Sequence, residues 1–153
     1  MSSISSPLED AALLQMEEDS AALRMELASS WPTAGEVDQM LEKACGAPPG
    51  SATELRKIGQ LLAVYVTDPH HHYRFPTWQF LSDGRPIPQF AEILGILREL
   101  GPYLDKNGRT TGWGEVEWFL APHVLLEDRP PSDLLPHNPQ AVLDAALVEY
   151  TQE

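Results

Sequence analysis

The fold is decided by three consecutive stretches of the sequence: SATELRK (51–57), QLLAVYVT (60–67) and YRFPTWQF (73–80). Ser51 is a favourable helix N-cap and Gly59 a favourable helix stop, so the first stretch predicts a short helix. The second stretch is rich in β-branched and aromatic residues and predicts a strand, which residues 73–75 follow as a returning strand. This part of the chain therefore predicts a helix that leads into a two-stranded hairpin.

A further helix is predicted just upstream. Thr33 and Glu36 have the spacing of a capping box, in which each side chain accepts a hydrogen bond from the backbone of the other residue. The helix is expected to end at the Gly/Pro turn of residues 46–50. Helix, turn, short helix and hairpin is the order of a winged helix-turn-helix, whose second helix enters the major groove of DNA while the hairpin lies along the backbone.

The predicted second helix carries the residues expected to contact DNA. Thr53, Arg56 and Lys57 are three and four positions apart, so they share one face of the helix. Arg74 lies on the predicted wing, where it is placed to reach a phosphate. The candidate DNA-binding residues are Ser51, Thr53, Arg56, Lys57 and Arg74.

After the central unit the sequence predicts helices, because apolar residues recur at helical spacing in residues 88–100, 113–121 and 139–150. The predicted fold is mainly α with a small β-hairpin (α+β), a winged helix-turn-helix-like unit followed by a compact helical domain. The predicted organisation is an acidic N-terminal helix or arm (1–30), the winged helix-turn-helix-like unit (31–86) and a helical partner-binding domain (87–153).

Residues 8–28 predict the N-terminal helix. Its apolar residues form a short a/d seam with spacings of three, seven and four positions: Leu13, Met16, Leu23 and Leu27. Such a helix either packs on its own domain or serves as an arm for dimerisation or for binding a partner. Both interpretations stay open on the sequence alone.

The net charge of −13 is unevenly distributed along the chain. It is −5 over residues 1–30, −1 over residues 31–86 and −7 over residues 87–153, and these three values sum to −13. Affinity for DNA comes largely from cations on phosphates, so the total argues against a simple nucleic-acid-binding protein. The nearly balanced centre still permits a local DNA contact on an otherwise repelling molecule.

The sequence contains no pattern that indicates catalysis. GRTTGWG (108–114) lacks the preceding strand and the following lysine of a phosphate-binding loop, and no Gly-x-Ser-x-Gly motif is present. His70 and His72 would share a face of a strand and could bind a transition metal, but no third ligand stands at a fixed spacing. The tip of a hairpin is the preferred interpretation of the histidine run. We therefore expect no enzyme, no cofactor and no metal site.

The single cysteine and the hydropathy indicate the compartment. Cys45 cannot form an internal disulfide and is expected to be a small buried residue. No apolar run is long enough to span a bilayer, and the first residues are acidic where a secretory signal would be basic and then apolar. A cytoplasmic protein without membrane association is expected.

Several short motifs follow one another over about residues 31–150. In the central unit they are IGQLLAV (58–64), YRFPTWQF (73–80) and DGRPIP (83–88), and in the C-terminal part WFLAP (118–122), LEDRPPSDLL (126–135) and VLDAA (142–146). In order and spacing these motifs resemble those of bacterial proteins of the Xre/MbcA/ParS antitoxin-like group. One difference is that the group often has a glycine where this chain has Glu127 and Asp128.

The resemblance implies a transcriptional autoregulator, or an antitoxin that binds a partner toxin, often of the RES type acting on NAD. It implies that Arg56, Lys57 and their neighbours meet DNA, and that the C-terminal helices meet the toxin or a second copy, so a homodimer is expected. The candidate partner-binding residues are Trp118, Phe119, Arg129, Pro131, Leu134 and Leu135.

The predicted function is therefore that of a non-enzymatic antitoxin-like or transcriptional regulatory protein. It would bind DNA through the central helix-turn-helix and a partner, such as a toxin, through the C-terminal helices. The alternative is an acidic interaction or inhibitor protein that has lost DNA binding. The charge of −13 supports this alternative.

Overall fold

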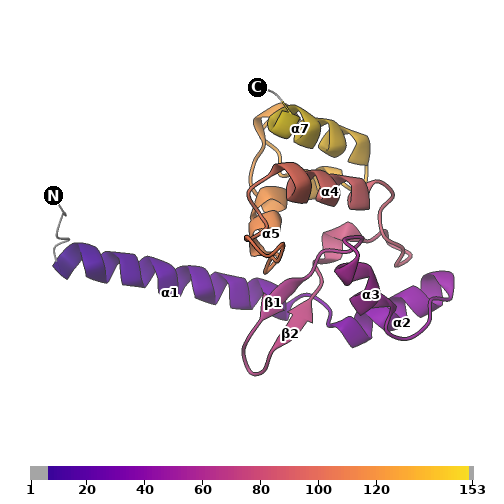
Figure 1. Ribbon diagram of the computed structural model, residues 1–153, viewed down its shortest axis with the longest axis horizontal. Helices are drawn as coiled ribbons and strands as arrows, with labels where there is room; N and C mark the ends of the chain where they lie inside the picture. Colours follow the sequence, from indigo (N-terminus) through magenta and orange to yellow (C-terminus); the bar gives the residue numbers. More distant parts are fainter. Residues whose placement is uncertain (1–6, 152–153) are drawn as a thin grey trace.

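The structure is a computed structural model that describes residues 7–151. Within that range the chain forms seven α-helices, two short 3₁₀ helices and one antiparallel hairpin (Figure 1). In chain order these are α1 (Pro7–Ser29), α2 (Ala34–Cys45), α3 (Ser51–Lys57), β1 (Val64–Val66), β2 (His72–Arg74), η1 (Thr77–Gln79), α4 (Phe90–Leu100), α5 (Trp113–Leu120), η2 (Val124–Leu126), α6 (Pro131–Leu134) and α7 (Pro139–Thr151). The fold is mainly α with a small β-hairpin, which confirms the predicted fold class. Across the described residues, none of the helices combines the length and the apolar character that crossing a membrane requires.

Most of the buried side chains form one large core among the C-terminal helices. Helices α4 and α7 lie side by side (Figure 1), and their packing is the most extensive between any two elements of the described chain. Phe90 of α4 and Phe119 of α5 stack in its interior with ring centroids 5.3 Å apart. Leu62 and Val64, from the segment that leads into the hairpin, belong to the same core. The hairpin is therefore anchored on the C-terminal helices, across the predicted boundary at residue 86.

A smaller core lies between α2, α3 and the segment after the hairpin. Its buried residues include Val37 of α2, Ala52 of α3 and Phe75. The capping box predicted at the start of α2 is confirmed, because Thr33 Oγ1 accepts from Glu36 N at 3.3 Å and Glu36 Oε1 accepts from Thr33 N at 3.1 Å. The elements of this region follow one another in the predicted order of helix, turn, short helix and hairpin.

Cys45 is exposed, so the prediction of a buried cysteine was wrong. Val37 and Leu41 stand eight and four positions before it on the same stripe of α2, and both are buried in the small core. The last turn of α2 runs past that core, which leaves Cys45 at the surface. Its Sγ donates a hydrogen bond to the carbonyl oxygen of Leu41 at 3.2 Å.

The strand predicted over residues 60–67 is shorter in the structure, where β1 covers only Val64–Val66. The physical reason is a buried side chain, Gln79. Its Oε1 accepts from Leu62 N at 2.8 Å, and its Nε2 donates to Leu62 O at 2.8 Å. The backbone of Leu62 is thus paired with an amide side chain instead of a neighbouring strand.

The YRFPTWQF segment (73–80) joins the two cores. Phe75 and Phe80 are buried in the small core, whereas Trp78 packs on the large core, 4.8 Å from the ring of Phe119. Residues 77–79 form the 3₁₀ turn η1. The short turn directs successive aromatic rings to different cores. The segment therefore packs against both parts of the molecule.

Helix α1 projects from the rest of the molecule as an arm (Figure 1). Contacts near its C-terminal end anchor it, where Ala28 is buried in the large core and Arg24 pairs with Glu117 of α5 at 3.0 Å. Leu13 and Leu23 of the predicted seam are 54% and 61% exposed. The side chains of residues 9–27 are exposed, so this part of the helix does not pack on its own domain. An arm for dimerisation or for binding a partner stays a prediction.

Candidate functional site

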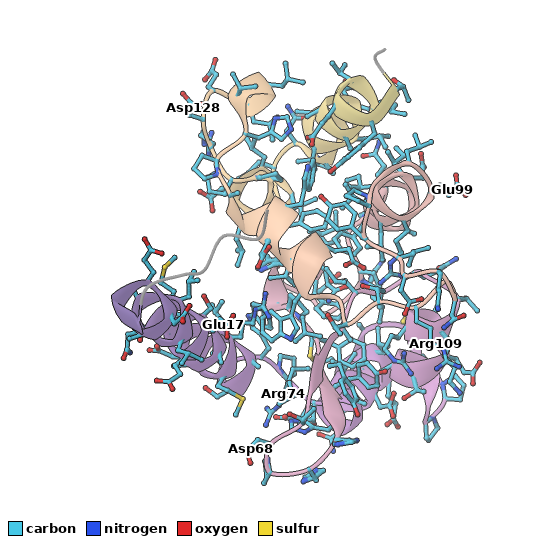
Figure 2. The ribbon with its side chains drawn as sticks, turned by 60° about the vertical axis from the view of Figure 1, so that its left-hand side comes forward. Glu17, Asp68, Arg74, Glu99, Arg109 and Asp128 are labelled. Atoms are coloured by element: carbon cyan, nitrogen blue, oxygen red, sulfur yellow. The ribbon has the colours of Figure 1, made fainter. Side chains whose placement is uncertain are left out.

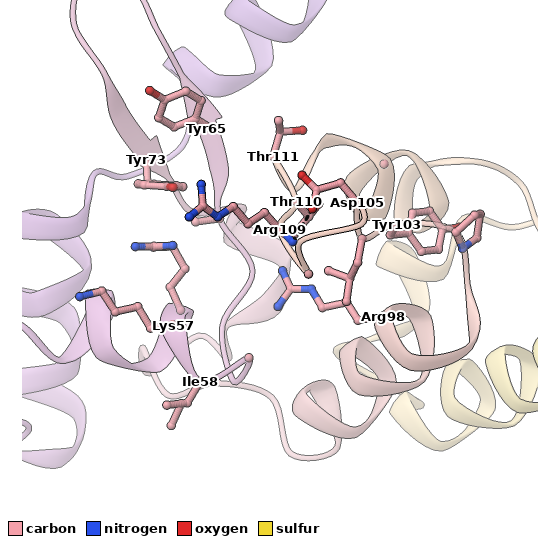
Figure 3. Close-up of a pocket in the computed structure, with 17 residues that line it drawn as sticks. Lys57, Ile58, Tyr65, Tyr73, Arg98, Tyr103, Asp105, Arg109, Thr110 and Thr111 are labelled. Atoms are coloured by element: carbon pink, nitrogen blue, oxygen red, sulfur yellow. Dashed lines mark hydrogen bonds between the residues drawn. The ribbon is translucent and has the colours of Figure 1, made fainter.

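A cleft of about 1200 Å³ opens between α3, the hairpin and the loop that connects α4 to α5 (Figure 3). Four basic side chains line it: Arg56, Lys57, Arg98 and Arg109. The whole chain has ten lysines and arginines, so four of the ten meet at one place in a molecule of net charge −13. This cleft is the candidate functional site, because a concentration of like charge attracts ligands of opposite charge.

Arg56 and Lys57 enter the cleft from the last turn of α3. The guanidinium of Arg56 lies 3.9 Å above the ring of Tyr73 on β2, a cation–π contact that orients the charged group. Tyr73 faces Tyr65 of β1 in the strand register, and the two rings are 5.4 Å apart. The hairpin thus supplies an aromatic wall beside the basic end of α3.

Arg98 of α4 is held in place by a buried carboxylate. Its Nε donates to Glu115 Oε2 at 3.0 Å, and the other oxygen of this fully buried carboxylate accepts from Thr110 Oγ1 at 2.9 Å. A buried charge needs both a partner and hydrogen bonds, and Glu115 has them. The pair neutralises the charge of Arg98, so the excess positive charge of the cleft comes from Arg56, Lys57 and Arg109.

Arg109 approaches from the opposite wall, where Figure 3 shows its side chain extending toward the hairpin. The loop that carries it is closed by Asp105, whose Oδ1 accepts from Arg109 N at 2.9 Å and from Asn107 N at 2.8 Å. These hydrogen bonds, that of Arg109 first, hold the pKa of Asp105 below its usual value. Asp105 therefore stays ionised and offsets one positive charge at this edge of the cleft.

The GRTTGWG stretch (108–114) forms the wall of the cleft next to β1. Thr111 O accepts from Tyr65 N at 2.8 Å, so the loop runs beside the strand. Gly112 has a φ of +85°, and a Cβ at this position would lie 2.1 Å from Ala63 O. Only glycine fits such a close approach of two backbones. The stretch serves this packing, a role that its sequence does not indicate.

The structure brings two of the predicted DNA-binding residues, Arg56 and Lys57, into the cleft and leaves three outside it. Ser51 is at the start of α3, where its hydroxyl donates to Pro48 O at 2.5 Å, and half-buried Thr53 does not line the cleft. Arg74 is engaged in internal contacts, with Nη1 donating to Trp31 O at 2.9 Å. Figure 2 shows Arg74 on the hairpin and Arg109 in a separate part of the view.

Tyr65, Tyr73, Arg98 and Arg109 were not singled out from the sequence. A signal existed for the two tyrosines, because residues paired directly across a hairpin point to the same face. No local pattern indicates the two arginines. They come from distant segments that meet the hairpin only in the folded chain.

Most of the predicted partner-binding residues are part of the large core. Phe119 and Leu135 are fully buried, Pro131 is buried, and Trp118 is buried with its Nε1 donating to Glu149 Oε1 at 2.9 Å. Leu134 is half-buried and packs against the core, and Arg129 is exposed. Packing in the core accounts for the buried apolar residues among them. A partner would therefore contact the exposed surface beside these residues. The most exposed apolar residues there are Val124 and Leu125, at 79% and 50%.

The turn after η2 has an unusual backbone. Glu127 and Asp128 have φ values of +57° and +61°, in the left-handed region that favours glycine. These are the positions at which the antitoxin-like group often has a glycine. The left-handed conformation gives a physical reason for a glycine at these positions. In this chain Glu127 and Asp128 adopt that conformation without a glycine.

The histidines at the tip of the hairpin are bonded to their surroundings. His71 Nδ1 lies 2.5 Å from the Tyr65 hydroxyl, and His72 Nδ1 lies 2.7 Å from His70 O. Among residues 7–151, no group of three or more His, Cys, Asp or Glu side chains is arranged to hold a metal ion.

Comparisons with known proteins add information on the fold alone. Neither a family model nor a curated protein matches the sequence. Among solved structures, the chain is similar to the NMR structure of Rv2175c, with a TM-score of 0.58 and 19% sequence identity. The similarity covers 78% of this chain and 82% of that one, so the fold is shared over most of both proteins.

Proposed function

We propose that this chain is a non-enzymatic regulatory protein of the antitoxin-like kind that binds double-stranded DNA through the basic cleft. The observation that carries the proposal is the meeting of Arg56, Lys57 and Arg109 beside the tyrosines of the hairpin. The second helix and the wing are the parts of a winged helix-turn-helix that face DNA. The resemblance to the Xre/MbcA/ParS group supports the same function.

The positive side chains of the cleft favour contacts with DNA phosphates over extensive contacts with the edges of the bases. Arg56 is stacked on Tyr73, so its guanidinium is oriented in advance for a phosphate oxygen. Glu54 lies on the exposed side of α3 and repels the backbone of DNA. Arg56, Lys57 and Arg109 form no ion pair among the described residues, so up to three of these side chains can contact phosphates. The logarithm of the binding constant should then fall with the logarithm of salt concentration with a slope of about −3. This shallow slope is the quantitative signature of the proposal.

A mobility-shift assay with the DNA upstream of the chain's own gene, repeated at several salt concentrations, tests the proposal. The variant Arg56→Ala/Lys57→Ala should bind at least about tenfold more weakly and reduce the salt slope by about two. The matched control is Lys43→Ala/Arg85→Ala, which removes the same charge from residues that do not line the cleft. The proposal is wrong if the native chain does not bind at low salt, or if both variants lose affinity equally.

The partner-binding half of the proposal rests on the exposed turn η2. Val124 and Leu125 stand out from the buried residues around them, beside exposed Arg129. We propose this surface as the contact for a protein partner, with a toxin as the expected class. If a co-transcribed neighbour binds the chain, Val124→Ser/Leu125→Ser should weaken the complex without changing thermal stability. Loss of stability in that variant would count against a surface role.

The second candidate is an acidic interaction protein that has lost DNA binding. The net charge of −13 and the projecting acidic helix α1 favour it. It predicts that Arg56→Ala/Lys57→Ala leaves the biological activity of the chain intact, whereas the first proposal predicts its loss. The same variant therefore separates the two functions.

A further inference from the structure

Helix α1 exposes an apolar stripe along its length. Leu13, Met16 and Leu23 are between 54% and 63% exposed, and Leu27 is 38% exposed. The spacings of three, seven and four positions place them on one side of the helix, with Ser20 in the gap. Such a stripe is normally buried against another helix, and no other part of residues 7–151 covers it.

The helix is presented in a fixed direction. Arg24 bonds to Glu117 at 3.0 Å, and its guanidinium lies 5.5 Å from the centre of the Trp113 ring. Ala28, four positions later on nearly the same side, is buried at 2% exposure. These contacts anchor the end of α1 on the molecule while its first turns project away (Figure 1). The stripe is therefore available for another helix.

Carboxylates flank the stripe on both sides. Asp10 and Glu17 stand at the positions that border one side, and Asp19 and Glu26 border the other, in the places called e and g in a coiled coil. Figure 2 shows Glu17 on the projecting helix. The one basic residue of α1 is Arg24, and its charge is already paired with Glu117. A second copy would set carboxylates against carboxylates, whereas lysines or arginines would find partners along both edges.

We propose that α1 is the docking surface for a basic amphipathic helix of another protein. The apolar residues of that helix would cover the stripe, and its lysines or arginines would pair with the flanking carboxylates. Charge complementarity selects this occupant over a second copy of the chain. This inference is independent of DNA binding, because it uses no residue of the cleft.

A synthetic peptide of three heptads, with leucine at a and d and lysine at e and g, is the probe. Fluorescence anisotropy of the labelled peptide with the full chain should show binding that weakens as salt rises. Two control peptides separate the contributions, one with glutamate at e and g and one with glutamine in place of the leucines. Both controls should bind at least about tenfold more weakly. Equal binding of either control overturns the proposal.

Variants of the arm test which side is used. Leu13→Ala/Met16→Ala/Leu23→Ala removes the stripe while keeping good helix formers, and should weaken peptide binding at least about tenfold. Leu14→Ala/Met25→Ala is the matched control, because these residues are also exposed, at 60% and 40%, but lie off the stripe. The control should bind like the native chain, and circular dichroism checks that both variants keep their helix.

The oligomeric state of the chain tests the alternative that a second copy covers the stripe. Sedimentation should find that the arm does not mediate self-association at low salt. A dimer that the stripe variant abolishes and the control retains would assign the surface to a second copy and overturn the proposal. Peptide binding that the stripe variant does not reduce would overturn it as well.

Discussion

At the scale of single residues, Gln79 performs the task of a strand partner. Its side chain is fully buried and makes three hydrogen bonds, two with the backbone of Leu62 and one from Nε2 to Pro76 O at 2.9 Å. A buried amide is stable only when its donors and acceptors are paired. Gln79 therefore ties the approach to the hairpin to the turn that follows the hairpin.

Gln79→Leu keeps the size of the side chain and removes these hydrogen bonds. The N–H and C=O of Leu62 would then be buried without partners, so the free energy of unfolding should fall by about 3 kcal/mol. Urea denaturation followed by tryptophan fluorescence measures the change. Gln60→Leu is the control, because Gln60 is exposed, and it should stay within about 0.5 kcal/mol of the native chain. Similar losses in both variants would contradict the assigned role of Gln79.

At the scale of elements, Glu149 fastens α7 to the end of α5 and to η2. Its Oε1 accepts from Trp118 Nε1 at 2.9 Å and lies 2.6 Å from His123 Nε2. Burial alone, the largest influence, would raise the pKa of Glu149. The hydrogen bonds from Trp118, His123 and Tyr150 outweigh it and bring the pKa below the ordinary value of 4.5. The ionised carboxylate is thus stabilised in the folded state.

The lowered pKa predicts an acid-sensitive contribution to stability. A carboxylate with a folded pKa below its unfolded value stabilises the fold above pH 4.5, and this stability is lost as pH falls through the folded pKa. In Glu149→Gln that contribution is absent, so stability should be lower at neutral pH and should fall less steeply below pH 4.5. Urea denaturation across the acid range measures both slopes. The control is Asp144→Asn on the same helix, and an unchanged acid slope in Glu149→Gln would contradict the prediction.

The same scale explains which parts of the fold the sequence predicts. The sequence predicts α4 and α7 with nearly the bounds that the structure shows, because helical periodicity is a local property. The strand over residues 60–67 is overpredicted, because the pairing of Leu62 with Gln79 depends on residues 17 positions apart. Apolar motifs do not separate interior from interface, so residues such as Phe119, expected to contact a partner, are buried in the core.

The candidate site was predictable in part for the same physical reason. Arg56 and Lys57 are on one short helix, and their common direction follows from helical spacing. Arg98 and Arg109 reach the cleft because the loop between α4 and α5 packs against β1. That packing depends on Gly112 and on the ion pair of Arg98 with the buried Glu115, contacts between segments that no local pattern indicates.

At the scale of the whole molecule, charge is separated between a basic cleft and an acidic arm. Residues 1–20 contain five acids and no bases, so a chain that begins at Ala21 has a net charge of −13 + 5 = −8. It keeps Arg24 and Ala28, which anchor the remainder of α1. This truncation changes the electrostatic field while leaving the cleft intact.

The shortened chain should bind DNA more tightly than the native chain at low salt, because less negative charge repels the phosphates. The difference should disappear at high salt, where distant charges are screened. Mobility shifts of both chains over a salt series measure the effect, and thermal unfolding checks that the midpoint is retained. A difference independent of salt would mean that the arm acts by direct contact and not through its charge.

The contacts around the hairpin also determine how this molecule can assemble with others. On the outer side of β1, Tyr65 N donates to Thr111 O and Tyr65 O accepts from Trp113 Nε1. On the outer side of β2, Phe75 N donates to Pro32 O. Within the described residues, both margins of the sheet are therefore closed by the chain itself. Incoming strands find no open template, so the hairpin is protected from the edge-to-edge growth that leads to fibrils.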